Sequence, residues 1–133
     1  MLQERWPDRF ALAILALTAF SAVNHASADD RLAAFMKAKL LHSEKVLEGL
    51  AKGDFDLIAQ HSQSINLLCE DEQWAVLKTA EYQDRTKAFQ RTVKQITTAA
   101  QDKNLEAAAL AYVSTTMQCV ECHKFMRESK KRP

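Results

Sequence analysis

The chain contains only two glycines and two prolines among its 133 residues. These residues form most tight turns, so a fold made of many short strands would need far more of them. Alanine, leucine, lysine, glutamate and glutamine are abundant instead, and all five favour helices. The sequence therefore predicts an all-α fold of long helices with few connections, and its length suits a single folded domain.

In the first half of the chain, apolar residues recur at helical spacing in two segments. One covers residues 30–52 and ends at Gly53, a residue type that often terminates a helix. Asp54 is placed to cap the second segment, 55–70, which we expect to end at the acidic run 70–72. The expected apolar stripe of the first helix is Leu32, Phe35, Met36, Leu40, Val46, Leu47 and Leu50.

Two further helices are predicted in the second half. Residues 74–79 form the longest expected connection, and a third apolar stripe then runs to Ala99 or Ala100. Asn104 is placed to cap a fourth helix. Its expected apolar face carries Leu105, Ala108, Tyr112, Thr116, Cys119, His123 and Met126. Two short connections with a longer one between them predict an antiparallel four-helix bundle.

Residues 1–28 are predicted to be a cleaved secretory signal peptide. Two arginines precede an apolar run of 14 residues, Phe10 to Val23, and Ala26-Ser27-Ala28 has the small-residue pattern of a cleavage site. A spanning helix needs about 20 apolar residues, so an uncleaved membrane anchor is the less favoured alternative. No later stretch is apolar enough to cross a membrane. We expect residues 29–133 to be a soluble, exported domain in the periplasm.

The formal net charge is +1, and the charged residues before residue 29 comprise two of each sign. This balance gives no reason to expect nucleic acid or an anionic membrane as a partner. The C-terminal residues 124–132 have a local basic bias. Such a tail is usually a solvated end, although it would also suit docking to an acidic redox partner.

The fourth predicted helix contains Cys119-Val120-Glu121-Cys122-His123, the C-x-x-C-H spacing of covalent haem attachment. Residues three and four apart lie on one face of a helix. Both thiols can therefore reach the vinyl groups along one side of a porphyrin while the imidazole of His123 turns toward the iron. The motif predicts one covalently attached haem c with His123 as an axial iron ligand.

Other uses of the cysteine pair remain open. A thioredoxin-like redox pair would need a βαβ context, and a zinc site would need two more ligands, whereas only His42 and His61 remain among the histidines after residue 28. A structural disulfide is permitted in an exported protein, but it would constrain little between residues one helical turn apart. The third cysteine, Cys69, lies on an apolar stripe and is expected to be a buried thiol, with a redox or intermolecular role as the alternative.

A C-x-x-C-H motif near the end of the last helix of a four-helix chain resembles the cytochrome c′ and cytochrome c556 family, over essentially the whole chain after residue 28. The resemblance implies that Arg127, four positions after His123, lies in the proximal haem pocket. Met126 stands where this family usually has an aromatic residue, with Phe125 displaced by one position. Members of the family commonly pair through their first helices, so the resemblance also implies a possible homodimer.

The family has two branches, which differ in the sixth iron ligand. In the c556 branch a methionine of the first helix supplies it, and Arg31 followed by Met36-Lys37 is similar to that pattern. In the c′ branch the iron is five-coordinate, and Phe35 would then cover an open position. We expect Met36 to be the ligand. His42 and His61 offer ligation by two histidines as a further alternative.

These features predict an electron-transfer cytochrome that exchanges electrons with a partner protein, because sulfur ligation of the iron stabilises its ferrous state. The alternative is a five-coordinate haem protein that binds nitric oxide or carbon monoxide. Catalysis such as peroxide reduction would need a distal acid–base pair, and none can be placed from the sequence. We therefore expect no enzyme activity and no catalytic residue.

Overall fold

The structure is a computed structural model that describes residues 27–75 and 79–131. Within these ranges the chain forms four helices and no strand, which confirms the predicted all-α class. The helices are α2 (Ala28–Lys52), α3 (Phe55–Ala75), α4 (Ala80–Gln101) and α5 (Leu105–Ser129). The predicted signal peptide lies outside the described residues except for Ser27 and Ala28, where α2 begins.

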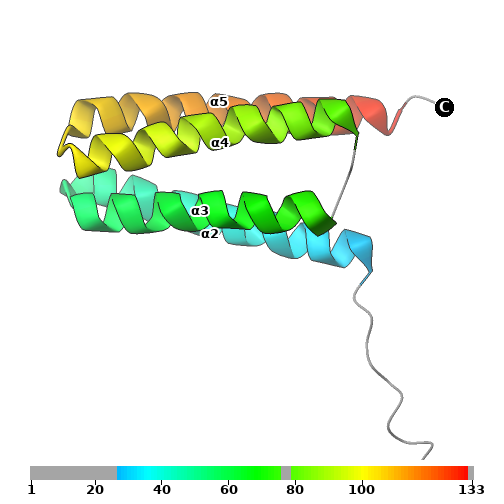
Figure 1. Ribbon diagram of the computed structural model, residues 1–133, viewed down its shortest axis with the longest axis horizontal. Coiled ribbons are helices and arrows are strands. Elements are labelled where there is room, and N and C mark those ends of the chain that lie inside the picture. Colours follow the sequence, from blue (N-terminus) through cyan, green and yellow to red (C-terminus); the bar gives the residue numbers. More distant parts are fainter. Residues whose placement is uncertain (1–26, 76–78, 132–133) are drawn as a thin grey trace, which may run out of the picture.

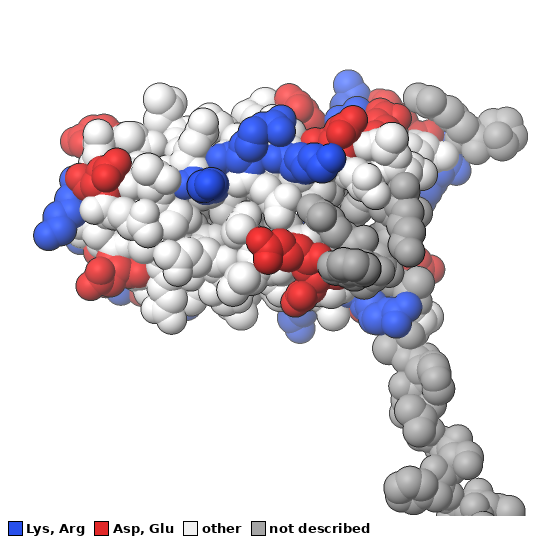
Figure 2. Space-filling view, viewed as in Figure 1, with Lys and Arg blue, Asp and Glu red and all other residues white. Residues whose placement is uncertain are grey.

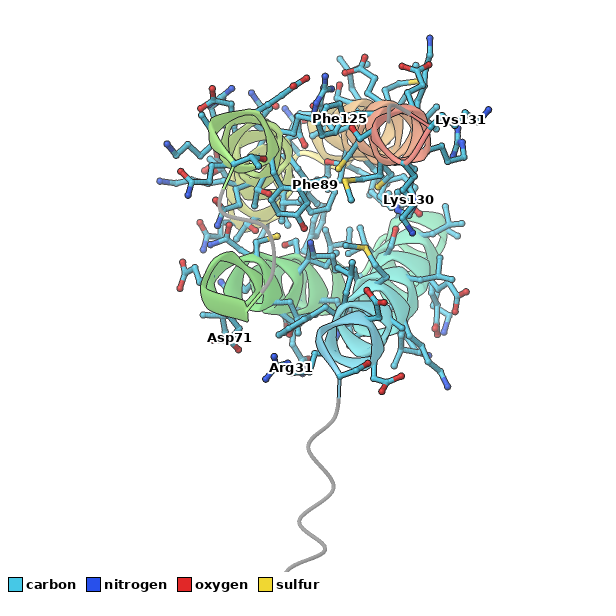
Figure 3. All side chains as sticks on the ribbon, turned by 90° about the vertical axis from the view of Figure 1, so that its right-hand side faces the viewer. Arg31, Asp71, Phe89, Phe125, Lys130 and Lys131 are labelled. Atoms are coloured by element: carbon cyan, nitrogen blue, oxygen red, sulfur yellow. The ribbon has the colours of Figure 1, made fainter. Side chains whose placement is uncertain are left out.

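The helices run alternately in opposite directions, so that α2 and α3 form one hairpin and α4 and α5 form a second (Figure 1). Seen end-on, the four helices occupy the corners of a bundle (Figure 3). Helix α3 packs along both α2 and α4, and α4 packs along α5, whereas α2 and α5 touch only sparsely. The bundle is therefore well closed on three sides and loosely closed on the fourth, which we call the α2–α5 seam.

Local capping chemistry places the helix ends close to their predicted positions. Gly53 ends α2 in the left-handed conformation, with φ of 68°. The carboxylate of Asp54 accepts a hydrogen bond from the Leu57 amide at 3.0 Å, and the side chain of Asn104 accepts one from the Ala107 amide at 2.9 Å. Each contact satisfies an amide that lacks a partner within the helix.

The end of α3 differs from the prediction, since the helix continues to Ala75 instead of stopping near residue 70. Acidic residues break an apolar stripe, but glutamate is a good helix former and does not by itself terminate a helix. The interval between Ala75 and Ala80 is still the longest of the three connections, as predicted.

The hydrophobic core runs along the middle of the bundle and is built from small and branched side chains. Cys69 is fully buried within it, as predicted. The core residues are Val46, Ile58, Ile65, Cys69, Val93, Ile96, Ala100 and Ala111.

Five residues of the predicted apolar faces are exposed, namely Leu40, Leu47, Thr116 and the motif residues Cys119 and His123. Leu40 and Leu47 lie two turns apart on one flank of α2 and have 61% and 52% of their surface exposed. On α5 the buried face includes Ala111 and Thr115, so Thr116 is rotated outward. In each case helical spacing alone could not show which flank a neighbouring helix would cover.

Charged side chains are distributed unevenly over the face shown in Figure 2. Lysine and arginine side chains form a band over α4, and acidic side chains gather over the last turns of α3. Both signs are present on one face, in keeping with the net charge of +1. None of the helices in the described residues is long and apolar enough to span a membrane.

Candidate functional site

The half of the bundle that includes the C-terminal part of α5 contains two adjoining cavities. The inner cavity has a volume of about 380 Å³ and the outer one about 570 Å³. Met36, Tyr82, Cys122 and His123 line both of them, so the two cavities are parts of one hollow between α2, α4 and α5. Small-molecule and cofactor sites typically have volumes of about 300–1,000 Å³, and this hollow falls in that range.

The three residues of the C-x-x-C-H motif that carry chemistry all line the inner cavity, as their spacing on one helix face predicts. Cys119 and His123 are one turn apart on α5, and Cys122 lies between them on the same side. Cys122 is half-buried, whereas Cys119 and His123 are exposed beside the α2–α5 seam. The motif can therefore be reached from solvent and from the cavity.

The thiol of Cys119 has an unusual environment. Although Cys119 is exposed, it also lines the cavity, and partial burial of its thiol raises the pKa of that group above the ordinary value of 9.0. The nearby charge of Lys39 opposes this rise, and Cys122 adds to it. The group is thus a neutral thiol at neutral pH, unlike the low-pKa thiolate of a reactive redox pair.

Met36 reaches the same hollow from α2. It is half-buried and lines both cavities together with Cys122 and His123. Arg127 and Met126 line the outer cavity, beyond His123. The structure thus brings all five predicted cofactor-binding residues to one hollow, four of them to its inner part.

Two other residues of the predicted distal side lie elsewhere. Arg31 is exposed and lies at the outer edge of the bundle (Figure 3). Phe35 is half-buried, and it is not among the residues that line either cavity. The structure therefore places neither residue at the hollow.

His42 and His61 contact each other instead of the hollow. Their Nδ1 atoms are 2.8 Å apart and their ring centroids 5.1 Å apart, across the contact between α2 and α3. Neither residue is among those that line the two cavities of the hollow. In the described parts of the chain no three His, Cys, Asp or Glu side chains form a group that could bind a metal ion. The pair is thus separate from the candidate site.

Sequence reasoning missed the two cations of the inner cavity, Lys39 and Arg85. A usable signal was present, because Lys39 follows Met36 by three positions and so shares its face of α2. In the same way Arg85 lies three positions after Tyr82 and four before Phe89, on the face of α4 that carries these aromatic rings.

Fold and site together define a four-helix protein with a cysteine-histidine motif beside an apolar hollow. Searches against protein-family models, curated proteins and solved structures find no match to this chain.

Proposed function

We propose that this protein is an exported monohaem c-type cytochrome that acts in electron transfer. Cys119 and Cys122 would attach the haem, His123 would be the proximal iron ligand and Met36 the distal one. The observation that carries the proposal is that Met36, from a different helix, lines the same hollow as all three residues of the C-x-x-C-H motif.

The residues around the hollow fit a haem in shape and polarity. A flat macrocycle could extend through both cavities, because they share lining residues. Ile65 and Phe89 give the inner cavity apolar walls suited to a porphyrin face. The Nε atom of Arg85 is buried without a hydrogen-bond partner among the described residues, which leaves a donor for a polar group of the cofactor.

The ligand set suits electron transfer. When bound, the haem supplies an iron that alternates between ferric and ferrous states. The imidazole of His123 and the thioether of Met36 are neutral ligands, and a thioether favours the ferrous state and raises the reduction potential. Because both ligands belong to packed helices, little of the protein needs to move between the two states.

The proposal includes export and a redox partner. The predicted signal peptide would bring residues 29–133 to the periplasm, where haem attachment would follow. The partner would be another protein that approaches the seam, where Cys119 and His123 are exposed. A small exposed edge of the cofactor at this place would permit electron exchange without substrate binding, so the proposed protein is not an enzyme.

The first experiment is expression with a haem-attachment system, followed by mass spectrometry and by absorption and EPR spectra in both oxidation states. We expect one haem bound through Cys119 and Cys122, and its loss in the double variant C119A/C122A. Mature protein without covalent haem would contradict the proposal.

Met36 ligation is tested with M36A and, as a matched control, M126A, because Met126 also lines the outer cavity. Low-spin ferric iron with a sulfur-to-iron charge-transfer band is expected in the wild type. That band should disappear in M36A and persist in M126A. High-spin iron in the wild type that binds carbon monoxide or nitric oxide would instead favour the five-coordinate, gas-binding alternative.

A further inference from the structure

The inner cavity is positively charged although its walls are mostly apolar. Lys39 of α2 and Arg85 of α4 both line it, and no aspartate or glutamate does so among the described residues. When a ligand excludes water from such a site, the two cations lose hydration, and negative charge on the ligand itself offsets that loss. The cavity therefore favours a ligand that is largely apolar and carries negative charge at its edge.

Arg85 is held in place by two contacts. Its Nη2 atom donates to the Glu81 carboxylate at 3.0 Å, one turn earlier on α4. Its guanidinium carbon lies 4.4 Å from the ring centroid of Phe125, which in Figure 3 lies between α4 and α5. The guanidinium group is thus fixed before any ligand arrives, and its planar fork suits a carboxylate.

These contacts leave the Nε–H group of Arg85 without an acceptor. The atom is buried and has no hydrogen-bond partner in the described part of the chain. A buried donor that lacks a partner destabilises the structure, and more so when the group is charged. Since Arg85 lines the cavity, a ligand oxygen there could satisfy this donor.

Lys39 provides a second cation on another helix. Its Nζ atom lies 5.3 Å from the ring centroid of Phe89, a residue that also lines the cavity. Lys39 and Arg85 therefore come from α2 and α4, and each stands over an aromatic ring. A ligand with two carboxylates on flexible arms could contact both cations.

We propose that Arg85 and Lys39 bind the two propionate carboxylates of the haem and so orient the ring for attachment at Cys119 and Cys122. This inference rests on the proposed function. Charge-assisted hydrogen bonds from a guanidinium favour the ionised carboxylate. The pairing consequently keeps the propionates ionised at lower pH and stabilises them as anions near the iron.

The test is the reduction potential of the purified holoprotein measured across pH, for the wild type, R85Q and R91Q. Arg91 is an exposed residue of the same helix and serves as the matched control. In R85Q the pH at which a propionate ionises should rise by about one unit or more, and the pH-dependent part of the potential should move with it. R91Q should behave like the wild type.

Resonance Raman bands of the propionate groups give a second readout that does not depend on electron transfer. They should shift in R85Q and in K39M, and R85K should restore only part of the wild-type pattern because lysine lacks the planar fork. If R85Q yields no holoprotein, R85K and K39M decide the question by the same two measurements.

Covalently attached haem with unchanged propionate ionisation and unchanged bands in these variants would overturn the assignment of Arg85 and Lys39 while leaving the proposed function intact. Absence of covalent haem in the wild type would instead overturn the proposed function itself.

Discussion

The imidazoles of His42 and His61 meet with their Nδ1 atoms 2.8 Å apart across the contact between α2 and α3. Burial lowers the pKa of His42 from its ordinary value of 6.5, and the charge of His61 lowers it further. Below pH 6.5 the unfolded chain therefore binds a proton that the folded chain resists. We predict that the free energy of unfolding decreases as pH falls from 6.5, and that H42Q weakens this decrease.

Urea unfolding at about pH 7.5 and about pH 5.5 measures this effect. E48Q is the control, because Lys45 and Lys52 lower the pKa of Glu48 from 4.5 to about 2. The stability that this carboxylate contributes is present above pH 4.5 and is lost only as pH falls toward 2. An H42Q variant with the wild-type pH dependence between the two conditions would contradict the role of the histidine pair.

Tyr112 makes hydrogen-bond contacts across the loosely closed α2–α5 seam. Its hydroxyl donates to the Ser43 carbonyl at 3.2 Å and lies 3.1 Å from the Ser43 hydroxyl. We predict that Y112F lowers the free energy of unfolding by about 1 kcal/mol, the usual net value of a hydrogen bond. S43A retains the carbonyl acceptor and should cost less in the same urea titration. If S43A instead lowered the free energy of unfolding more than Y112F, the contact between the two hydroxyls would be the more important one, and the prediction would be wrong.

Gly49 allows the last turns of α2 to approach the first turns of α3 closely. A Cβ atom at this position would lie 2.8 Å from Cγ1 of Ile58, a side chain that is fully buried. Replacing a helical glycine by alanine normally stabilises by about 1 kcal/mol, but overpacking a core costs about 1–3 kcal/mol. We therefore predict that G49A destabilises the protein, as measured by its thermal and urea midpoints.

The matched test of this packing argument is a double-mutant cycle with I58A, which removes Cγ1. The cost of G49A should shrink in that background. Equal costs in both backgrounds would mean that Gly49 is needed for another reason, such as the nearby backbone of Ile58 or Asp54.

In the chain without haem, Cys119 should alkylate slowly at neutral pH, because burial raises the pKa of its thiol. Lys39 opposes that rise, so K39M should slow the reaction further, whereas K37M, an exposed change on the same helix, should not. Peptide mapping after timed iodoacetamide treatment gives the rate at Cys119 alone. Faster alkylation in K39M would contradict the proposed effect of the lysine charge.

Features set by a few neighbouring residues could be predicted from sequence. Gly53, Asp54 and Asn104 mark helix ends because caps involve only the adjacent turn. Cys119 and His123 line the same cavity because helix geometry alone places them on one face.

Features set by the arrangement of whole helices could not be predicted in this way. Leu40 is exposed because α5 packs only sparsely against α2. Thr116 faces outward because the buried face of α5 passes through its neighbour Thr115. Arg85 resembles any solvated residue of a basic helix until the structure shows that it lines the cavity. Helical spacing identifies a stripe, but the neighbouring helices decide which side of it is covered.

The loose seam also has a consequence for the order of assembly. The extensive helix contacts join neighbours along the chain, whereas the sparse contact joins its first and last described helices. Contacts between sequence neighbours cost less loop-closure entropy and form quickly, and the meeting of the two chain ends comes at greater entropic cost. The three closed sides of the bundle can thus form first, while the side that holds Cys119 and His123 stays accessible. A large group can then be joined to an already folded chain without any helix being unpacked.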